Sequence, residues 1–201
     1  ALILGIFGAW AYGGSGPIVN PQENLRSVSA MWPNVEHFVL KSDLTTTGTI
    51  QDLKNLNGER YSIGMRNSGA EFTGFYIFDA LDINWSEELS VAYMGYGPSA
   101  NALQDGNIVG MNVPAGPPVT AITRAYALLG EEMTILDFTE EEIKSLNYEF
   151  PLWESYELEP GTYPTQVETI NTVASPNILI VREDVPEKIV YDMTKMLWEN
   201  L

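Results

Sequence analysis

Residues 52–71 (DLKNLNGERYSIGMRNSGAE) constrain the fold more than any other stretch, because they predict a helix, a strand and a second helix in quick succession. Asp52–Gly58 indicates a short helix ended by a turn glycine, Arg60–Gly64 indicates a brief strand, and Asn67–Glu71 begins a helix. A strand that ends in a loop of small residues and opens a helix leaves several backbone N–H groups without partners. The positive end of the helix dipole lies behind them, so these groups favour an anion such as a carboxylate.

The same alternation of strands and helices runs along the whole chain. Short runs rich in β-branched and aromatic residues predict strands at 2–7, 25–30, 37–41, 89–94, 108–113, 134–138 and 177–181. Spacing and capping residues predict helices at 72–81, 98–104 and 117–129, after a Thr139–Glu142 capping box, and from Pro186 onward. Residues 8–17 indicate a glycine-rich turn, and 148–166 indicate a loop. This order predicts an α/β fold with mostly parallel sheets.

Composition narrows the classes of partner. The chain has 201 residues, of which 45% are hydrophobic, and 10 basic against 27 acidic residues give a net charge of −17. Such a charge argues against nucleic acid and anionic membranes as partners. It also repels an anionic ligand at long range, so an anion site must act through local geometry. The absence of cysteine excludes disulfides and cysteine nucleophiles, and it fits both cytosolic and periplasmic proteins.

The apolar stretch at the start of the sequence, Ala1–Tyr12, is too short to span a bilayer. It also lacks the basic start of a signal peptide. We interpret it as a buried strand that is entered without its upstream partner, and we therefore expect the sequence to be part of a longer protein.

Three loops at predicted strand ends are candidates for ligand contact, because ligands in open α/β sheets lie beyond the carboxyl ends of the strands. The first contains Arg66, which could clamp a carboxylate, and Asn67, Ser68, Gly69 and Ala70, which could offer N–H groups. Glu71 stands three residues after Ser68, so a structural capping role is the stronger interpretation of its side chain.

The second candidate loop is Pro114–Pro118, where Gly116 is expected as the N-cap and Pro117 as the first helical residue. The third is Trp10–Gly16, where Trp10 and Tyr12 offer apolar walls with polar tips beside Gly13. Ordinary turn formation is the stronger explanation of the second loop, and buried packing explains the third equally well.

Conventional catalytic groups are scarce. His37 is the only histidine, and we interpret it as a structural residue. The sequence shows no metal-ligand spacing, nucleophile elbow or phosphate loop. The acidic runs Glu131–Glu132 and Glu140–Glu142 read as surface charge and a helix start. We therefore expect no catalytic residue, metal or cofactor.

Several motifs, taken in order, resemble one known family. Asp52–Lys54, Gly58–Arg60, Gly64 and Asn67–Gly69, followed by Ala102–Ile108, resemble the solute-binding proteins of TRAP transporters, and more narrowly their TAXI family. Further segments resemble that family in the same order: Arg26–Asn34, Glu159–Pro164 and Leu179–Pro186. Together they cover about residues 1–201. The chain departs from the family pattern at Trp32–Asn34, Asn67 and Val109–Gly110.

The resemblance implies a periplasmic-binding-protein type II fold, in which two α/β lobes close like a hinge on a ligand. The chain would cross between lobes near residues 39–42 and 169–174, so that 1–40 and 172–201 form lobe 1 and 41–171 form lobe 2. Lobe 1 would be incomplete, because family members carry a longer N-terminal part, with a signal peptide in the precursor, and a C-terminal tail.

The resemblance further implies a periplasmic or extracytoplasmic location and a ligand such as glutamate or 2-oxoglutarate. It also implies a TRAP membrane permease as the partner. Two alternatives remain, a ligand-sensing regulatory domain of the same fold and, less favoured, an enzyme on that fold. The expected ligand-contacting residues are Trp10, Tyr12, Gly13, Trp32, Arg66, Asn67, Ser68, Gly69, Ala70, Glu71, Gly116, Pro117 and Tyr163. The aromatic residues of this set, Trp10, Tyr12, Trp32 and Tyr163, are expected to form the wall opposite the Arg66–Glu71 loop.

Overall fold

The computed structural model describes residues 1–200 and divides them into two compact units. Unit 1 contains Ala1–Pro33 and the chain from Ser175 onward, and unit 2 contains Asn34–Ala174. Two long strands, β2 (Leu25–Val35) and β9 (Ile170–Arg182), each continue across a boundary between the units. The units meet between residues 33 and 34 and between residues 174 and 175. The sequence predicted lobe boundaries between residues 40 and 41 and between residues 171 and 172.

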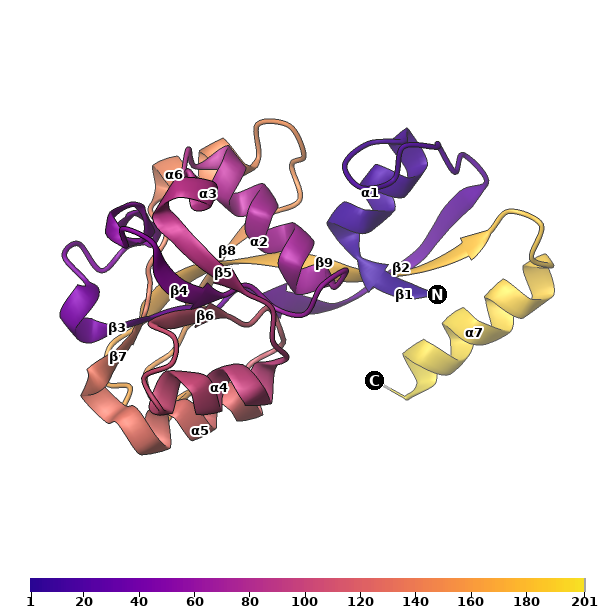
Figure 1. Ribbon diagram of the computed structural model, residues 1–201. Helices are drawn as coiled ribbons and strands as arrows, with labels where there is room; N and C mark the ends of the chain where they lie inside the picture. The colour runs from indigo at the N-terminus through magenta and orange to yellow at the C-terminus, as the bar shows by residue number, and fades with distance from the viewer. Residues whose placement is uncertain (201) are drawn as a thin grey trace. The chain divides into compact units, whose positions relative to one another are not determined.

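Unit 1 is built around β9, which lies between β1 (Leu2–Leu4) and β2 in its sheet (Figure 1). β1 pairs antiparallel with β9, with Leu2 opposite Leu179, and α7 (Glu187–Glu199) follows β9. The Pro186 start expected for this last helix is confirmed, since Pro186 is its N-cap.

The expected strand at residues 2–7 is wrong beyond Leu4. Helix α1 (Gly5–Gly13) begins immediately after β1, so the predicted glycine-rich turn at 8–17 is helical in its first half. Ile6 and Trp10 are buried on one face of this helix, at a spacing of four residues. A short apolar run does not by itself distinguish a strand from a buried helix. Gly14, at φ 67°, ends the helix, and its N–H donates to the Trp10 carbonyl oxygen.

Unit 2 contains a five-stranded sheet in the order β5-β4-β6-β3-β7. Its strands are β3 (Phe38–Lys41), β4 (Glu59–Ser62), β5 (Leu89–Ala92), β6 (Gly110–Asn112) and β7 (Met133–Ile135). β4 pairs parallel with both β5 and β6, whereas β3 pairs antiparallel with both β6 and β7. β3 is therefore the reversed strand, and the other four run in one direction. The α/β class is confirmed, but in the other sheet β1 and β8 each pair with β9 in the antiparallel rather than the parallel direction.

Helices cover both faces of the unit 2 sheet. Helices α2 (Gly69–Ala80), α3 (Trp85–Glu88) and α6 (Glu140–Leu146) lie on one face, and α4 (Tyr96–Gln104) and α5 (Thr120–Leu129) lie on the other (Figure 1). Short 3₁₀ helices are η1 (Ser42–Leu44), η2 (Ile50–Asn55) and η3 (Gly130–Glu132). The predicted helix at 72–81 and the Thr139–Glu142 capping box are both confirmed. No helix within the described part of the chain has the length and apolar character needed to cross a membrane.

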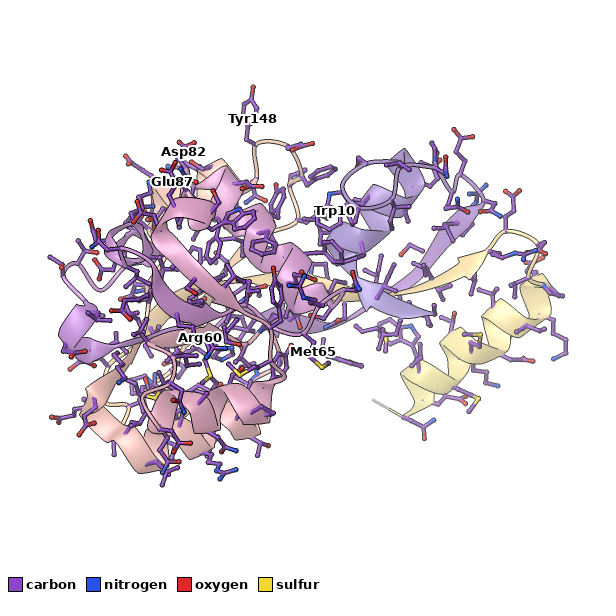
Figure 2. All side chains as sticks on the ribbon, viewed as in Figure 1. Trp10, Arg60, Met65, Asp82, Glu87 and Tyr148 are labelled. Carbon is purple, nitrogen blue, oxygen red and sulfur yellow. The ribbon has the colours of Figure 1, made fainter. Side chains whose placement is uncertain are left out.

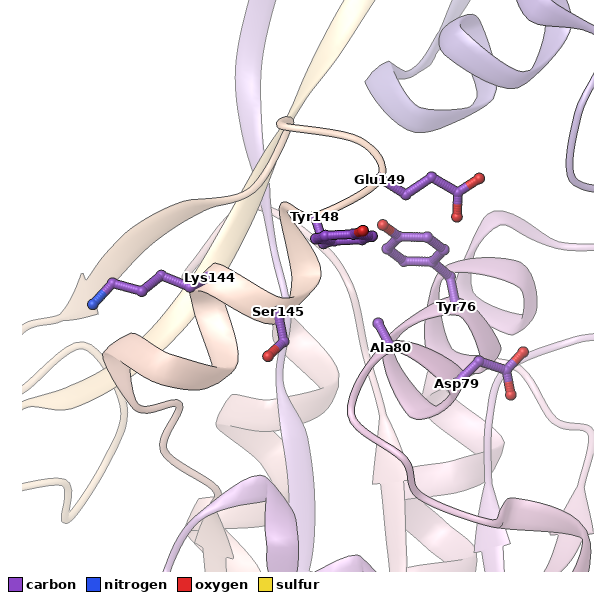
Figure 3. Close-up of a pocket in the computed structure, with 7 residues that line it drawn as sticks. All are labelled: Tyr76, Asp79, Ala80, Lys144, Ser145, Tyr148 and Glu149. Carbon is purple, nitrogen blue, oxygen red and sulfur yellow. The ribbon is translucent and has the colours of Figure 1, made fainter.

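The predicted loop at 148–166 hides a strand. β8 (Glu154–Leu158) pairs antiparallel with β9, with Leu158 opposite Ile170. Its sequence, ESYEL, has too few apolar residues to signal a strand alone. Before it, Tyr148 projects away from the ribbon of unit 2 (Figure 2), and a hollow lies between α2 and the end of α6 (Figure 3).

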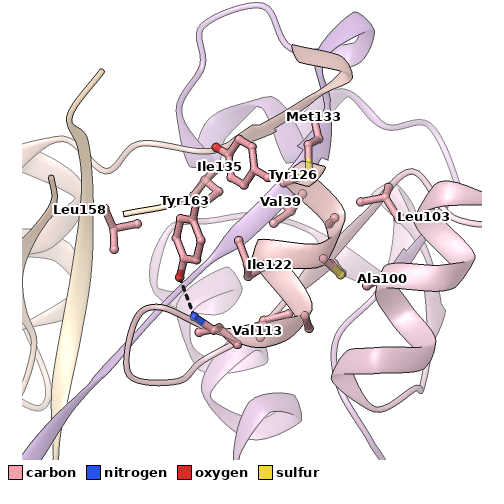
Figure 4. Close-up of a cluster of buried hydrophobic side chains, with 14 of the residues drawn as sticks. Val39, Ala100, Leu103, Val113, Ile122, Tyr126, Met133, Ile135, Leu158 and Tyr163 are labelled. Atoms are coloured by element: carbon pink, nitrogen blue, oxygen red, sulfur yellow. Dashed lines mark hydrogen bonds between the residues drawn. The ribbon is translucent and has the colours of Figure 1, made fainter. Parts of the chain in front are cut away.

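A buried hydrophobic cluster of unit 2 packs α4 and α5 against the sheet (Figure 4). Within the sheet, Gly110 in β6 lies very close to the neighbouring strands β3 and β4. A Cβ there would lie 2.3 Å from the Val39 carbonyl oxygen and 2.5 Å from the Tyr61 ring. Only glycine fits at this position without a shift of its neighbours.

Candidate functional site

The carboxyl ends of β4, β5 and β6 meet at one edge of the unit 2 sheet, because these strands are adjacent and parallel. Contacts between their loops show that they lie together. The position of a Gly95 Cβ would be 3.7 Å from the Met65 sulfur, and the Tyr96 hydroxyl donates to the Pro114 carbonyl oxygen at 2.9 Å. This edge is the place where open α/β sheets bind ligands.

Helix α2 presents its N-terminus at this edge. Ser68 is the N-cap, its hydroxyl oxygen accepts from the Glu71 N–H at 3.3 Å, and its own N–H donates to the Met65 carbonyl oxygen at 3.2 Å. Within residues 1–200, the N–H groups of Gly69 and Ala70 have no acceptor. The prediction of free N–H groups therefore matches Gly69 and Ala70, but it is wrong for Ser68, whose N–H is already paired with Met65.

The side chain of Glu71 turns back onto the same loop. Its carboxylate accepts from the N–H of Asn67, whose φ of 59° lies in the left-handed region, and Glu71 is buried. The expected capping role of Glu71 therefore matches its contacts. The N–H groups of Asn67 and Ser68 are thus already engaged within the protein, so an incoming carboxylate would meet the donors of Gly69 and Ala70.

Arg66 lies beside this N-terminus with its side chain exposed. Its guanidinium carbon is 3.8 Å from the centroid of the Tyr93 ring, in the loop after β5. Stacking of a guanidinium on an aromatic face is a favourable cation–π contact, and it leaves the N–H donors at the rim of the plane for a carboxylate. Tyr93 was missed by sequence reasoning, although its position directly after a parallel strand was a usable signal.

Helix α4 adds a second N-terminus at the same edge. Gly95 is its N-cap, no side chain caps it, and its first turn contains no acidic residue. In the described structure the N–H groups of Tyr96 and Gly97 have no acceptor. The sequence predicted this helix to begin at Pro98, so these two donors were also missed.

The second predicted loop is placed differently from expectation. Gly116 is exposed and Pro117 is half-buried, but helix α5 begins at Thr120 with Val119 as its N-cap. The predicted roles of Gly116 as N-cap and Pro117 as first helical residue are therefore wrong. The physical reason is that Pro117 precedes another proline, which disfavours the helical conformation of the residue before it. The N–H of the N-cap residue, Val119, is engaged by a buried tyrosine.

That tyrosine is Tyr163, which is 1% exposed and stacks on Tyr126 at 5.7 Å (Figure 4). Its oxygen accepts from the Val119 N–H at 3.2 Å and lies 2.6 Å from Nε2 of His37. Nδ1 of His37 contacts two carbonyl oxygens, those of Val35 and Val113, so Nδ1 carries the proton and Nε2 accepts from Tyr163. Tyr163 thus belongs to the core of unit 2 and not to a ligand-facing wall.

Of the ligand-contacting residues predicted in unit 1, some are buried in the core and others are exposed. Trp10 is 4% exposed, and its indole packs so closely on Gly16 that a Cβ there would lie 2.7 Å from the ring. Trp10 is therefore a core residue of unit 1. By contrast, Tyr12 and Trp32 are 54% and 52% exposed. Gly13 ends helix α1.

A buried acid lies behind the α2 side of the sheet and was not predicted. Glu36 is fully buried, and neither of its carboxyl oxygens has a hydrogen-bond partner among the described residues. Burial raises the pKa of Glu36 to about 8, although the nearby Asn112 amide and Thr73 hydroxyl favour its charged form. Burial lowers the pKa of the neighbouring His37 to about 4. Both side chains are thus neutral near pH 7.

Residues 1–200 contain no group of three or more histidine, cysteine or acidic side chains that could hold a metal ion. What they do contain, at one edge of one sheet, is two helix N-termini with unpaired N–H groups and a guanidinium. This arrangement defines an α/β protein with a site suited to an anionic group.

The chain belongs to the NMT1-like family, whose model matches residues 1–201. Curated protein sequences include no match to it. Among solved structures, it is similar to a TctC solute-binding protein from Polaromonas, at 15% identity and a TM-score of 0.48, over 99% of this chain and 62% of that one. It is also similar to an ABC transporter periplasmic binding protein from Brucella ovis with glutathione bound, at 13% identity and a TM-score of 0.45, over 87% of this chain and 41% of that one.

A third similar structure is the amino acid ABC transporter substrate-binding protein AbpA from Streptococcus pneumoniae, bound to L-arginine. Its identity is 13% and its TM-score 0.43, over 90% of this chain and 60% of that one. The chain thus spans between 41% and 62% of the length of these three structures.

Proposed function

We propose that this chain is the ligand-binding part of an extracytoplasmic solute receptor of a TRAP transporter, of the TAXI type. The receptor captures a small carboxylate similar to glutamate or 2-oxoglutarate between its two lobes and delivers it to the membrane permease. The observation that carries the proposal is the carboxyl edge of β4, β5 and β6, where Gly69 and Ala70 offer unpaired N–H groups beside Arg66.

Family membership and the names of similar structures support the general class. The Polaromonas protein is described as a solute-binding protein, and the other two structures contain bound glutathione and L-arginine. Each of these ligands carries at least one carboxylate, which is the group that a helix N-terminus recognises. The choice of a TRAP permease over another transporter rests on the ordered motifs in the sequence, such as Asp52–Lys54 with Asn67–Gly69.

The charge of the chain shapes how such a site would work. A net charge of −17 gives an anionic ligand no long-range attraction, so recognition depends on donors within hydrogen-bond distance. In unit 1, the exposed rings of Tyr12 and Trp32 are the candidates for apolar contact with the rest of the ligand. We place no catalytic residue in the site, because binding and release require none.

Replacing Gly69 by proline tests the anion site directly. Gly69 is the first residue of α2, where proline is well tolerated, and Ser68 before it already has the extended φ and ψ of −98° and 161° that proline requires of its neighbour. Gly69→Pro therefore removes one donor and keeps the helix. We expect calorimetry on the full-length protein to show roughly 10-fold weaker binding of glutamate or 2-oxoglutarate, the effect of one lost charge-assisted hydrogen bond.

Gly69→Ala is the matched control, because it adds a Cβ at the same place and keeps the N–H. It should bind the carboxylate within about 2-fold of the unaltered protein. Equal affinities for the proline and alanine variants would show that the Gly69 N–H does not contact the ligand. If no carboxylate binds the full-length protein at all, the proposed ligand class is wrong.

A further inference from the structure

Three buried side chains of unit 2 carry polar atoms without hydrogen-bond partners, on the face of the sheet that α2 covers. Among the described residues, both carboxyl oxygens of Glu36, both amide atoms of Asn112 and the Tyr61 hydroxyl are unpaired. A Cβ on Gly74 of α2 would lie 3.2 Å from the Asn112 amide nitrogen, and the Tyr61 ring lies 6.5 Å from that of Phe78 in α2. Buried polar groups without partners cost free energy, so this cluster indicates a role other than stability.

The Glu36 carboxyl group is connected to the start of α2. The hydroxyl group of Thr73, in the second turn of α2, lies near this carboxyl group. The same hydroxyl donates to the Gly69 carbonyl oxygen at 2.9 Å. Gly69 is the first residue of α2, and its N–H is one of the two donors that have no acceptor. Two short steps therefore join the buried acid to the anion site.

The protonation state of Glu36 decides what this connection does. A neutral carboxyl group has an O–H to donate to the Thr73 oxygen, which leaves the Thr73 proton on the Gly69 carbonyl oxygen. An ionised carboxylate only accepts, so it competes with Gly69 for the Thr73 proton. It also places a negative charge behind the helix N-terminus, which opposes the field that favours an anionic ligand.

The ionisable groups around Glu36 are mostly fixed in charge near neutral pH. Burial and the Glu36 charge raise the pKa of Tyr96 in α4 to about 12 and that of Tyr61 in β4 well above its ordinary value. Burial lowers the pKa of His37 to about 4. In α2, the Glu71 carboxylate accepts from the loop before the helix, and β6 and residues 170–174 of β9 contribute no ionisable side chain. Of the groups with shifted pKa values, only Glu36, at about 8, changes charge between pH 7 and 9.

This inference rests on the proposed carboxylate site and adds a residue that controls it. We propose that Glu36 is a positioning residue: its neutral carboxyl group, acting through Thr73, holds the first turn of α2 in the form that offers the Gly69 and Ala70 N–H groups. Ionisation of Glu36 disturbs that form. Because a bound anion favours neutral Glu36, the affinity for a carboxylate falls as the pH rises through about 8.

The first test follows the turn of α2 without any ligand. In carbon–proton NMR spectra of the full-length protein, the methyl resonances of Ala70 and Thr73 should titrate with a midpoint near pH 8. Methyl groups are the right probes because unpaired amide protons exchange rapidly with water at alkaline pH. The titration should disappear in Glu36→Gln. It should persist in Glu87→Gln, the matched control at an exposed acid in α3.

The second test measures the binding of 2-oxoglutarate by calorimetry, because the charge of this probe is constant between pH 7 and 9. The unaltered protein should bind it about 5- to 10-fold more weakly at pH 9 than at pH 7. Glu36→Gln keeps an uncharged donor, so its affinities at the two pH values should agree within about 2-fold. Glu36→Leu removes both the charge and the donor, and at both pH values it should bind roughly 3- to 5-fold more weakly than Glu36→Gln.

The two tests separate the positioning role from the proposed function. A constant Ala70 methyl shift, a titration that persists in Glu36→Gln, or equal affinities of the leucine and glutamine variants would overturn the positioning role. If the methyl titration depends on Glu36 but 2-oxoglutarate binds at neither pH, the coupling of Glu36 to α2 stands and the proposed ligand class is wrong.

Discussion

Glu36 and His37 are consecutive residues whose pKa values move in opposite directions for the same reason. Burial raises the pKa of Glu36 from 4.5 to about 8 and lowers that of His37 from 6.5 to about 4. Their backbone is also tied to β9, because the Glu36 N–H donates to the Val173 carbonyl oxygen and the Thr172 hydroxyl donates to the Glu36 carbonyl oxygen. Ionisation of either side chain therefore affects the stability of the fold at the start of unit 2.

The two shifts predict an unusual dependence of stability on pH. Between pH 4.5 and 6.5, the unfolded chain protonates His37 and releases the Glu36 proton, so the two effects nearly cancel. Between pH 6.5 and 8, only Glu36 differs, and the folded state binds the extra proton. We therefore expect the free energy of unfolding to fall by up to about 2 kcal/mol over this interval, as measured by urea denaturation.

Glu36→Gln separates the two contributions, because glutamine keeps the shape and cannot ionise. The free energy of unfolding of this variant should stay constant between pH 6.5 and 8. It should decrease from pH 6.5 to 5.5, where only His37 differs in protonation between the folded and unfolded states. A variant with the same alkaline slope as the unaltered protein would show that another group is responsible.

Among the secondary structure elements, η2 (Ile50–Asn55) depends on one buried carboxylate. Asp52 is 1% exposed and accepts from the N–H groups of Thr46, Thr47 and Gly48 at 2.9–3.1 Å, and from the Thr47 hydroxyl at 2.8 Å. We expect Asp52→Ala to lower the free energy of unfolding by about 3 kcal/mol, because three amides lose their acceptor. Asp43→Ala, at an exposed acid in η1, should change it by less than about 0.5 kcal/mol. Similar values for both variants in chemical denaturation would contradict this role.

Some elements could be predicted because their signals are local. The helix at 72–81 has apolar residues at regular spacing, and the residue types of the Thr139–Glu142 capping box predict the hydrogen bonds that they form. Helix α1 and strand β8 could not be predicted, since ESYEL becomes a strand only through its pairing with β9. Position in the sheet, rather than propensity, determines such segments.

In the candidate site, too, residues with local sequence signals could be predicted, and residues that depend on distant parts of the chain could not. Unpaired amides at Gly69 and Ala70 follow from a cap and a helix start, and these were predicted from the sequence. The Ser68 amide was predicted to be free with them, but the Met65 carbonyl oxygen accepts from it. Tyr163 was not placed correctly, because its role depends on His37, which lies 126 residues away. Tyr93 and the α4 N-terminus join the site only through the order of parallel strands, which the sequence does not state.

At the scale of the whole molecule, unit 2 is one continuous segment with its own sheet and core. Excised as Asn34–Ala174, it should fold alone, since β8 retains its pairing partners at residues 170–174. We expect cooperative urea unfolding and the same loss of stability between pH 6.5 and 8 that Glu36 gives the full chain. The same segment carrying Asp52→Ala serves as the destabilised comparison. A non-cooperative transition in the unaltered segment would show that unit 2 requires unit 1.

Unit 1, in contrast, combines residues 1–33 with the chain from Ser175 onward, and β9 is the last of its strands to be made. β9 separates β1 from β2, so residues 1–33 leave the ribosome before the strand that joins β1 to β2 exists. Unit 2 can close while they wait, because all of it lies before residue 175. During synthesis residues 1–33 must therefore complete their sheet after residues 34–174, which follow them. Any factor that binds the nascent N-terminal strands would act during that delay.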